Sequence, residues 1–314
     1  MNDPIIINGF LFRKTEIEDV LILRDDDFNE NYLKSSVVDY MMSSGVKALE
    51  LNESFNERVV DLDFLKQVLW IESITIIKSG VTNYQNLKCL IGLKRITNNY
   101  TSESIDFSAF KKLESANILW AEGRTNLLEC ESLEVLILYK YNGKKMLDFE
   151  HLKHLKHLEL ISSSIDSIDG IEHLGNLETI ELSYNNKLSD LSKLSKYKKL
   201  KKIKLDNLSK IENLFFLEGC KELEYVSIKN CNKINDNTSL FKLTDLKVLG
   251  YLKSGTFTTI KGIEHLQNLE KLVFYDTDIM DGDLEPIRKL KKLNYCYFKD
   301  KKHYNLKHKD FSLP

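Results

Sequence analysis

The sequence predicts an α/β solenoid, in which short parallel strands stack along one face of a repeat protein. A short motif recurs about every 22 residues over most of the 314-residue chain. It contains three apolar residues, separated by two other residues and then by one, as in Leu155, Leu158 and Leu160. The copies begin at residues 46, 71, 93, 113, 133, 155, 177, 200, 223, 246, 269 and 293. A repeat of this length is typical of stacked structural units.

Each copy predicts a strand followed by a thin return segment. Leu158 and Leu160 alternate with polar neighbours, so the two leucines would point into the core and the neighbours away from it. Apolar residues then return at intervals of three, as in Ile165, Ile168 and Ile171. An α-helix would mix threes and fours, whereas strict threes favour a 3₁₀ or extended segment. Stacked copies would form one core and a parallel sheet of about 12 strands.

This motif resembles the leucine-rich repeat family, in particular its short 22-residue class of internalin-like proteins and phosphatase regulators. The resemblance covers roughly residues 46 to 300. The family's Asn, three positions after the strand's last apolar residue, matches Asn185, and Cys231 occupies the same slot. Hydroxyl side chains fill the slot in other copies: Ser54, Ser79, Thr101, Ser163, Ser254 and Thr277. The resemblance implies a horseshoe with a concave sheet and a convex face of 3₁₀ or extended segments, and a protein-binding role.

The ends of the chain predict caps for the exposed ends of the core. Residues 1–45 would form an N-terminal cap, residues 46–298 the repeats and residues 299–314 a C-terminal cap or tail. In the N-terminal cap, Asn8-Gly9 predicts a type I′ hairpin turn between residues 5–7 and 10–12. Asp27 and Glu30 resemble a capping box, which predicts a helix from Asp27 to about Ser43.

Composition narrows the class of protein. The net charge is −2, with 24 acidic and 17 basic residues before residue 151 and 23 acidic and 28 basic residues after it. This polarity is too weak to indicate a nucleic-acid partner. The sequence shows neither a long apolar run nor a secretory signal, so we expect a cytoplasmic protein with no membrane partner. Its richness in Lys, Asn and Ile suggests a bacterial source.

The sequence predicts no catalytic site, metal site or cofactor. Three of the five cysteines, Cys130, Cys220 and Cys296, occupy apolar slots of the repeat, which favours buried thiols over disulfides or metal ligands. His151 and His154 each precede a core leucine, so their spacing follows the repeat rather than a tetrahedral metal site. No phosphate-binding glycine loop, nucleophile elbow or zinc-protease motif is visible.

The candidate partner-binding residues lie between the core positions of the strands. They form an apolar and aromatic group, a charged group and a second aromatic group near the end of the chain. These residues are Leu119, Trp120, Val135, Ile137, Tyr139, His157, Glu159, Glu181, Tyr184, Lys202, Lys204, Tyr225, Val273, Tyr275, Tyr295 and Tyr297. Aromatic anchors with charged neighbours are typical of protein interfaces. The alternative is that strands favour aromatic residues for packing alone.

We therefore interpret the chain as a non-catalytic, protein-binding solenoid that engages a macromolecular partner on its concave face. A narrower version is an immunity or antitoxin-like inhibitor of a toxin. A different possibility is RNA binding through the basic C-terminal end. The lysine run from Lys193 to Lys202 is interpreted as a solvated outer face. The sequence does not indicate the partner's identity or the oligomeric state.

Overall fold

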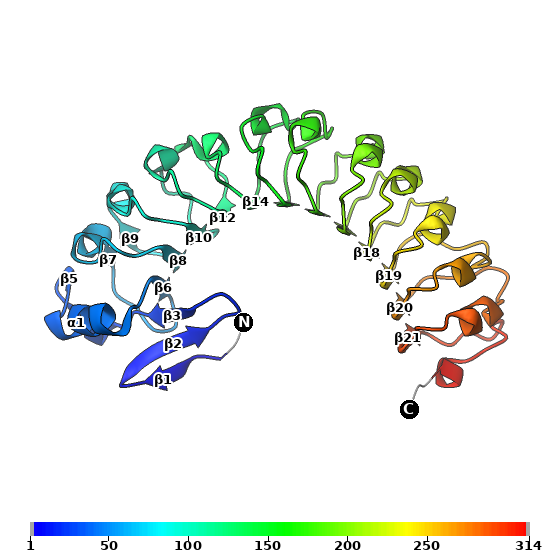
Figure 1. The fold of residues 1–314 in the computed structure, drawn as a ribbon, viewed down its shortest axis with the longest axis horizontal. Helices are drawn as coiled ribbons and strands as arrows, with labels where there is room; N and C mark the ends of the chain where they lie inside the picture. Colours follow the sequence, from blue (N-terminus) through cyan, green and yellow to red (C-terminus); the bar gives the residue numbers. More distant parts are fainter. Residues whose placement is uncertain (1–2, 312–314) are drawn as a thin grey trace. The chain divides into compact units, whose positions relative to one another are not determined.

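The computed structural model describes residues 3–311. The chain divides into two compact units, residues 1–140 and residues 141–314. Within each unit, strands line one side of the stacked repeats and 3₁₀ turns line the other, here called the strand side and the outer side (Figure 1). Met1, Asn2 and residues 312–314, which the sequence assigns to the two caps, lie outside the described residues.

The first unit contains five repeat strands in parallel register. Core residues align across the sheet, with Leu49 opposite Ile74, then Ile96, Ala116 and Leu136. All five are buried because they face the return segments. The strands are β6 (Ala48–Asn52), β8 (Ser73–Ile77), β10 (Arg95–Asn98), β12 (Ser115–Leu119) and β14 (Val135–Tyr139).

The outer side of the first unit consists of short 3₁₀ helices, each preceded by two extended residues. This arrangement confirms the prediction from the three-residue apolar spacing. The elements are β7 (Val60–Asp61), η2 (Leu62–Gln67), β9 (Val81–Thr82), η3 (Tyr84–Cys89), β11 (Ile105–Asp106), η4 (Phe107–Ala109), β13 (Arg124–Thr125) and η5 (Leu127–Glu129).

The N-terminal segment of the first unit contains the expected hairpin. Strands β1 (Ile5–Ile7) and β2 (Phe10–Lys14) pair antiparallel. Asn8 and Gly9 both have positive φ, 50° and 84°, as a type I′ turn requires. Strand β3 (Asp19–Ile22) pairs antiparallel with β2 and parallel with β6, which joins the hairpin to the repeat sheet.

The predicted helix start at Asp27 is wrong. Instead, η1 (Asp25–Asp27) is followed by a two-stranded ribbon, β4 (Phe28–Asn29) and β5 (Tyr32–Leu33), and the helix α1 spans Ser35–Ser44. The Asp27 carboxylate accepts a hydrogen bond from the Arg24 N–H at 2.7 Å, so it closes a turn before the ribbon. Glu30 adopts φ 48° at the ribbon's turn, which interrupts any right-handed helix there.

The second unit contains seven repeat strands, again in parallel register. They are β15 (His157–Ile161), β16 (Thr179–Ser183), β17 (Lys202–Asp206), β18 (Tyr225–Lys229), β19 (Val248–Leu252), β20 (Lys271–Phe274) and β21 (Tyr295–Phe298). Its 3₁₀ helices are η6 (Leu147–Phe149), η7 (Ile171–His173), η8 (Ser192–Lys196), η9 (Phe215–Gly219), η10 (Thr238–Lys242), η11 (Ile263–His265), η12 (Glu285–Lys289) and η13 (His308–Phe311). The five repeat strands described in the first unit and the seven in the second together equal the 12 strands that the sequence predicts.

Residues 299–311 pack against the last repeat strand of the second unit. Tyr304 and Leu306 are buried, and the rings of Tyr304 and Phe311 lie 6.1 and 5.7 Å from the Phe298 ring. The Tyr304 hydroxyl accepts a hydrogen bond from the Ile279 N–H at 3.2 Å. These contacts cover apolar residues of β21, while the predicted boundary between repeats and cap stays a prediction.

Four strands of the second unit, β16 to β19, are each followed by a residue with left-handed backbone geometry. Tyr184, Asn207, Asn230 and Lys253 have φ between 46° and 58°. Each donates its backbone N–H to a carbonyl at the end of the next strand, as Lys253 does to the Tyr275 carbonyl just after β20 at 2.8 Å. The turn therefore links neighbouring repeats. The backbone of each of these residues is strained, because a left-handed conformation is unfavourable for residues other than glycine.

The buried turns that follow these residues are held by side-chain hydrogen bonds. Asn185 is fully buried, and its amide donates to the Leu160 carbonyl and accepts from the Ser163 N–H, both at 2.9 Å. In later repeats Ser254 accepts from the Cys231 N–H at 3.0 Å, and the Thr277 hydroxyl donates to the Tyr251 carbonyl at 3.3 Å. Hydroxyl groups thus perform part of the role of the asparagine.

The cysteines in repeat slots are buried thiols. Cys130, Cys220, Cys231 and Cys296 are buried in the structure. Burial raises the pKa of the Cys130 thiol to about 11 and that of Cys220 to about 12. Among residues 3–311, no group of three His, Cys, Asp or Glu side chains lies close enough to hold a metal ion. No helix in the same range is long and apolar enough to cross a membrane.

Replacing Asn185 by alanine should destabilise the protein because two buried backbone groups lose their partners. We expect Asn185→Ala to lower the free energy of unfolding by about 3 kcal/mol, measured by urea denaturation. Asn186→Ala, at the neighbouring exposed position, is the matched control and should leave the free energy of unfolding nearly unchanged. Equal effects of the two substitutions would contradict the role assigned to Asn185.

Glycine should relieve the backbone strain at Lys253. Because Lys253 has φ 46° and an exposed side chain, we expect Lys253→Gly to raise the free energy of unfolding by about 1 kcal/mol. Lys271→Gly, at an exposed position inside strand β20, should lower it instead. Thermal unfolding of the two variants tests the difference in sign, and a loss of stability in both would contradict the strain.

Candidate partner-binding surface

The strand side of the first unit is partly covered by its own N-terminal hairpin. Arg13 on β2 donates to both carboxylate oxygens of Glu50 at 2.9 Å. Glu18, in the turn between β2 and β3, pairs with Arg95 on β10 at 2.7 Å. Every residue of β6 is buried, including Ala48, whereas alternate residues of β10, β12 and β14 remain partly exposed. The binding surface of this unit therefore begins beyond β6.

The predicted apolar group of the first unit does form one surface. Leu119 on β12 lies opposite Tyr139 on β14, and both side chains are partly exposed. Val135 and Ile137 occupy the same face of β14 and are also partly exposed. The backbone N–H of Trp120 donates to the Tyr139 carbonyl at 2.8 Å, which fixes Trp120 at the exit of the strands. These five residues form the apolar patch of the first unit.

Glu181 is the centre of the predicted charged group in the second unit. Its two carboxylate oxygens pair with Lys202 at 2.7 Å and with Lys204 at 3.0 Å. Strand register explains this geometry, because Glu181 lies directly opposite Lys204 on β17 and diagonally across from Lys202, two residues earlier on the same strand. The Glu181 side chain is only 9% exposed, whereas the two lysines are 33% and 39% exposed. The cluster therefore presents ammonium groups to solvent above a buried carboxylate.

Burial and neighbouring charges shift the pKa values of the titratable groups in this cluster. Burial alone would raise the pKa of Glu181, but hydrogen bonds from Lys202 and Lys204 outweigh it and hold that pKa below its ordinary value. Burial lowers the pKa of His157, so this imidazole is neutral at pH 7. Burial, followed by the Glu181 charge, raises the pKa of Glu159, which lies opposite Glu181 on β15. Glu181 is therefore the carboxylate that stays charged most readily in this cluster, and the two lysines pair with it.

Aromatic side chains extend the strand side of the second unit beyond this cluster. The Lys202 ammonium lies 5.6 Å from the centre of the Tyr225 ring, a cation–π contact. Farther along, Tyr275 and Tyr297 stack with ring centres 6.0 Å apart. Tyr295 is 50% exposed and Tyr297 38% exposed. These aromatic rings lie in one surface, so a partner can contact several of them together.

Two of the predicted binding residues, Val273 and Tyr184, lie outside the groups described above. Val273 lies opposite Tyr297 on the neighbouring strand, and its aliphatic side chain is partly exposed. Tyr184 follows β16 rather than lying in it, and its left-handed backbone serves the turn between repeats. Its ring is 50% exposed at the edge of the charged cluster. Tyr184 therefore belongs to the rim of the surface.

Comparisons with known proteins bear on the fold. No family model and no curated protein sequence matches the chain. Among solved structures, an internalin, InlF of Listeria monocytogenes, is 17% identical, with 90% of this chain and 82% of that chain covered and a TM-score of 0.53. The functional domain of InlJ from the same organism is 16% identical, with 81% and 62% covered and a TM-score of 0.51. A leucine-rich repeat protein of Leptospira interrogans is 15% identical, with 89% and 83% covered and a TM-score of 0.49.

The parallel strands, the 3₁₀ return segments and these structural likenesses agree. The chain has the leucine-rich repeat fold. At such low sequence identity, similarity to solved structures establishes the fold alone. The functional residues therefore have to be identified from the surfaces of the repeats themselves.

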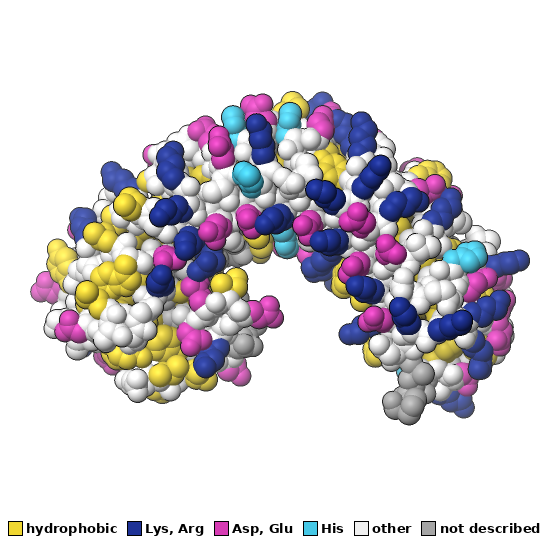
Figure 2. Space-filling view, in the orientation of Figure 1, with side chains coloured by type: hydrophobic (Ala, Val, Ile, Leu, Met, Phe, Trp, Pro, Cys, Tyr) yellow, Lys and Arg dark blue, Asp and Glu magenta, His cyan; other side chains and the backbone are white. Residues whose placement is uncertain are grey.

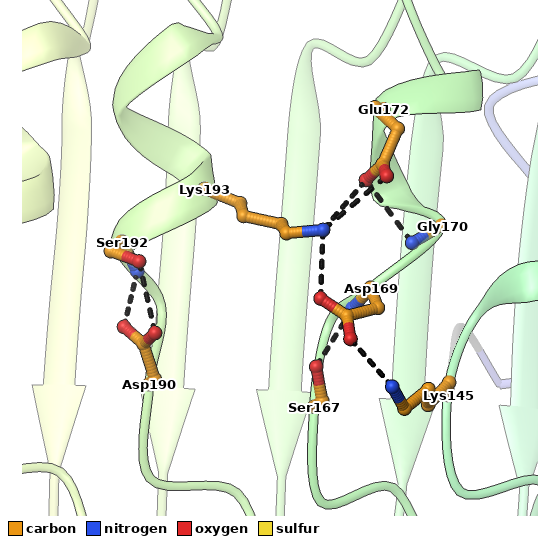
Figure 3. A network of polar contacts seen from close by, with 8 residues as sticks. All are labelled: Lys145, Ser167, Asp169, Gly170, Glu172, Asp190, Ser192 and Lys193. Carbon is orange, nitrogen blue, oxygen red and sulfur yellow. Dashed lines mark hydrogen bonds and ion pairs between the residues drawn. The ribbon is translucent and has the colours of Figure 1, made fainter.

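The outer side of the leucine-rich repeats carries polar contacts that the sequence reasoning missed. Figure 3 shows Lys193 pairing with Asp169 at 2.7 Å and with Glu172 at 3.3 Å, while Lys145 pairs with the other Asp169 oxygen at 2.8 Å. These side chains come from different repeats, and each is substantially exposed. Figure 2 shows acidic and basic side chains interspersed over the visible surface. Only the three-dimensional spacing of neighbouring repeats reveals such pairs.

A second cluster of polar side chains lies around Asp206, at the end of strand β17. Asp206 accepts hydrogen bonds from the side-chain amides of Asn207 at 2.6 Å and Asn230 at 3.2 Å. Lys229 lies 3.4 Å from its other oxygen. The repeat spacing of Asn207 and Asn230, 23 residues apart with an aspartate beside the first, is the sequence signal that could have identified this group.

The Glu181 cluster should give the leucine-rich repeats a pH-dependent stability. Because the folded-state pKa of Glu181 lies below the unfolded value, its contribution is complete above about pH 5 and is lost as the pH falls through the folded-state pKa. We expect wild type to be more stable than Glu181→Gln at pH 7, and the difference to shrink below about pH 4. Urea denaturation across this range is the measurement, and a difference independent of pH would contradict the cluster.

Proposed function

We propose that this protein is a non-catalytic binding protein whose leucine-rich repeats engage a protein partner through their strand side. The observation that carries the proposal is the group of aromatic rings formed by partly exposed Tyr275 and exposed Tyr295 and Tyr297, on the same sheet as the charged cluster around Glu181. Aromatic side chains provide large contact areas at small entropic cost, and they are enriched at energetically important interface positions.

The charged cluster supports a role in orienting the partner. Lys202 and Lys204 are both held by one carboxylate, so their ammonium groups are ordered before binding. Ordered charges favour one orientation of a partner more than they add to affinity. The apolar patch of the first unit, which includes Leu119, Val135 and Tyr139, supplies a second contact area of the kind found in interface cores.

Removing the exposed tyrosines should weaken partner binding without unfolding the repeats. Wild type and a Tyr295→Ser, Tyr297→Ser variant would be immobilised and used to capture proteins from a lysate of the source organism, with quantification by mass spectrometry. We expect a protein enriched by wild type to fall about tenfold with the variant, because two exposed anchors are lost. Circular dichroism would confirm that both proteins are folded.

The matched control lies on the outer side of the same unit. Phe215 and Leu147 are 54% and 55% exposed on η9 and η6, away from the strands. A Phe215→Ser, Leu147→Ser variant should capture the partner as wild type does. A parallel Trp120→Ala, Tyr139→Ala variant tests the apolar patch of the first unit. Equal retention of every captured protein by wild type and both strand-side variants would overturn the proposal.

A further inference from the structure

Two segments of the second unit are nearly identical, and their single difference is informative. Residues 170–178 and 262–270 share every residue except one, Gly175 in the first copy and Gln267 in the second. Both copies fold alike: Gly170 and Gly262 have φ 98° and 109° and begin η7 and η11. The shared sequence therefore builds the same turn, and within the segment itself only this position distinguishes the two copies.

In the second copy, Gln267 bridges two neighbouring repeats. Its side-chain amide donates to the Glu264 carbonyl at 2.6 Å and to the Lys289 carbonyl at 3.1 Å. Lys289 is the last residue of η12, in the next repeat along the chain. The glutamine side chain thus occupies the space between η11 and η12.

In the first copy, glycine leaves the corresponding space open. A pocket of about 430 Å³ lies between η7 and η8, and Gly175 is among its lining residues. A Cβ atom added at Gly175 would meet nothing within 4 Å. Small-molecule and side-chain pockets of comparable volume are ordinary binding sites in proteins. The missing side chain at Gly175 accounts for the opening.

The floor of this pocket is apolar and its shape is fixed. Ile171 and Leu177 are core residues that contribute to the floor, and Tyr197 forms one wall. The Tyr197 hydroxyl donates to the Ile171 carbonyl, which ties the ring across the two repeats. A bound apolar side chain would therefore find a preformed surface rather than a collapsible gap.

The rim of the pocket carries more lysines than it has acidic side chains to pair with them. Lys193 is engaged by Asp169 and Glu172, as Figure 3 shows. Lys196, Lys198 and Lys199 also line the pocket, their side chains are exposed, and the described residues provide none of the three with an ion-pair partner. Three lysine side chains thus lie along one side of an apolar recess, on η8 and the residues that follow it.

We propose that this pocket binds an acidic peptide segment that carries one bulky apolar side chain. The apolar side chain would enter the recess above Ile171 and Leu177, and flanking carboxylates would pair with Lys196, Lys198 and Lys199. A single carboxylate cannot contact three lysines distributed along a turn, whereas acidic residues on both sides of an apolar one can. The site is separate from the strand-side surface and does not rest on the function proposed for that surface.

Binding would be measured by fluorescence polarisation with a labelled peptide, Asp-Asp-Trp-Asp-Asp, at about 0.15 M salt. We expect saturable binding to wild type. Two related peptides should bind at least about tenfold more weakly: one with lysines in place of the aspartates, and one with glycine in place of the tryptophan. Equal binding of all three peptides, or no binding of the first, would overturn the proposal.

Gly175→Gln is the decisive variant because it installs the side chain that the second copy of the segment already carries. It should weaken peptide binding at least about tenfold while retaining the stability of wild type in urea denaturation. This variant changes no charge, so it separates the recess from general attraction to a basic surface. Unchanged affinity in a folded Gly175→Gln protein would overturn the proposal.

The lysines have a matched control four repeats later in the chain. Lys289, Lys291 and Lys292 follow the core residue Ile287 at the same spacing as Lys196, Lys198 and Lys199 follow Leu194, and all six are exposed. Replacing the first pocket's three lysines by glutamate should abolish binding, and replacing Lys289, Lys291 and Lys292 by glutamate should leave it within about twofold. Equal losses in the two triple variants would show non-specific electrostatics and would contradict the site.

Discussion

Hydrogen bonding between neighbouring repeats is the constraint on which the rest of the structure depends. No repeat can pair its own strand or satisfy its own turn, so each backbone group at a strand end must find its partner in the next repeat. Lys253 shows the cost, because it adopts a left-handed conformation to donate its N–H across the gap. Asn185 shows the benefit, because one buried amide satisfies backbone groups of the preceding repeat.

This constraint separates the residues that maintain the fold from those available for binding. Alternate strand residues must face the core, and the remaining ones face solvent in strict register. Glu181 and Lys204 meet because the register places them opposite each other. On the outer side the register is equally strict, so a single difference such as Gly175 in place of glutamine changes the surface without changing the backbone around it.

Sequence periodicity predicted the repeat strands, the 3₁₀ segments and the alternation of core and solvent-facing residues along the strands, because all three follow from local spacing. It could not place the helix start, since the backbone turn at Glu30 and the ribbon around it outweigh the capping pattern. Nor could it show that β6 is covered, because the Glu18–Arg95 pair joins residues far apart in the sequence. The pocket beside Gly175 also escaped prediction, since an absent side chain leaves no pattern of its own.

The hairpin at the start of the first unit restricts where further repeats can be added to the chain. Strand β3 runs in the direction of the repeat strands, but β2 runs against it and β1 reverses again. A further repeat placed before β1 would be separated from the parallel strands by this reversal, and its return segment would have no matching coil to pack on. A new repeat therefore fits after β3 rather than before β1, and the near-identical nine-residue segments of the second unit illustrate a duplication within the array.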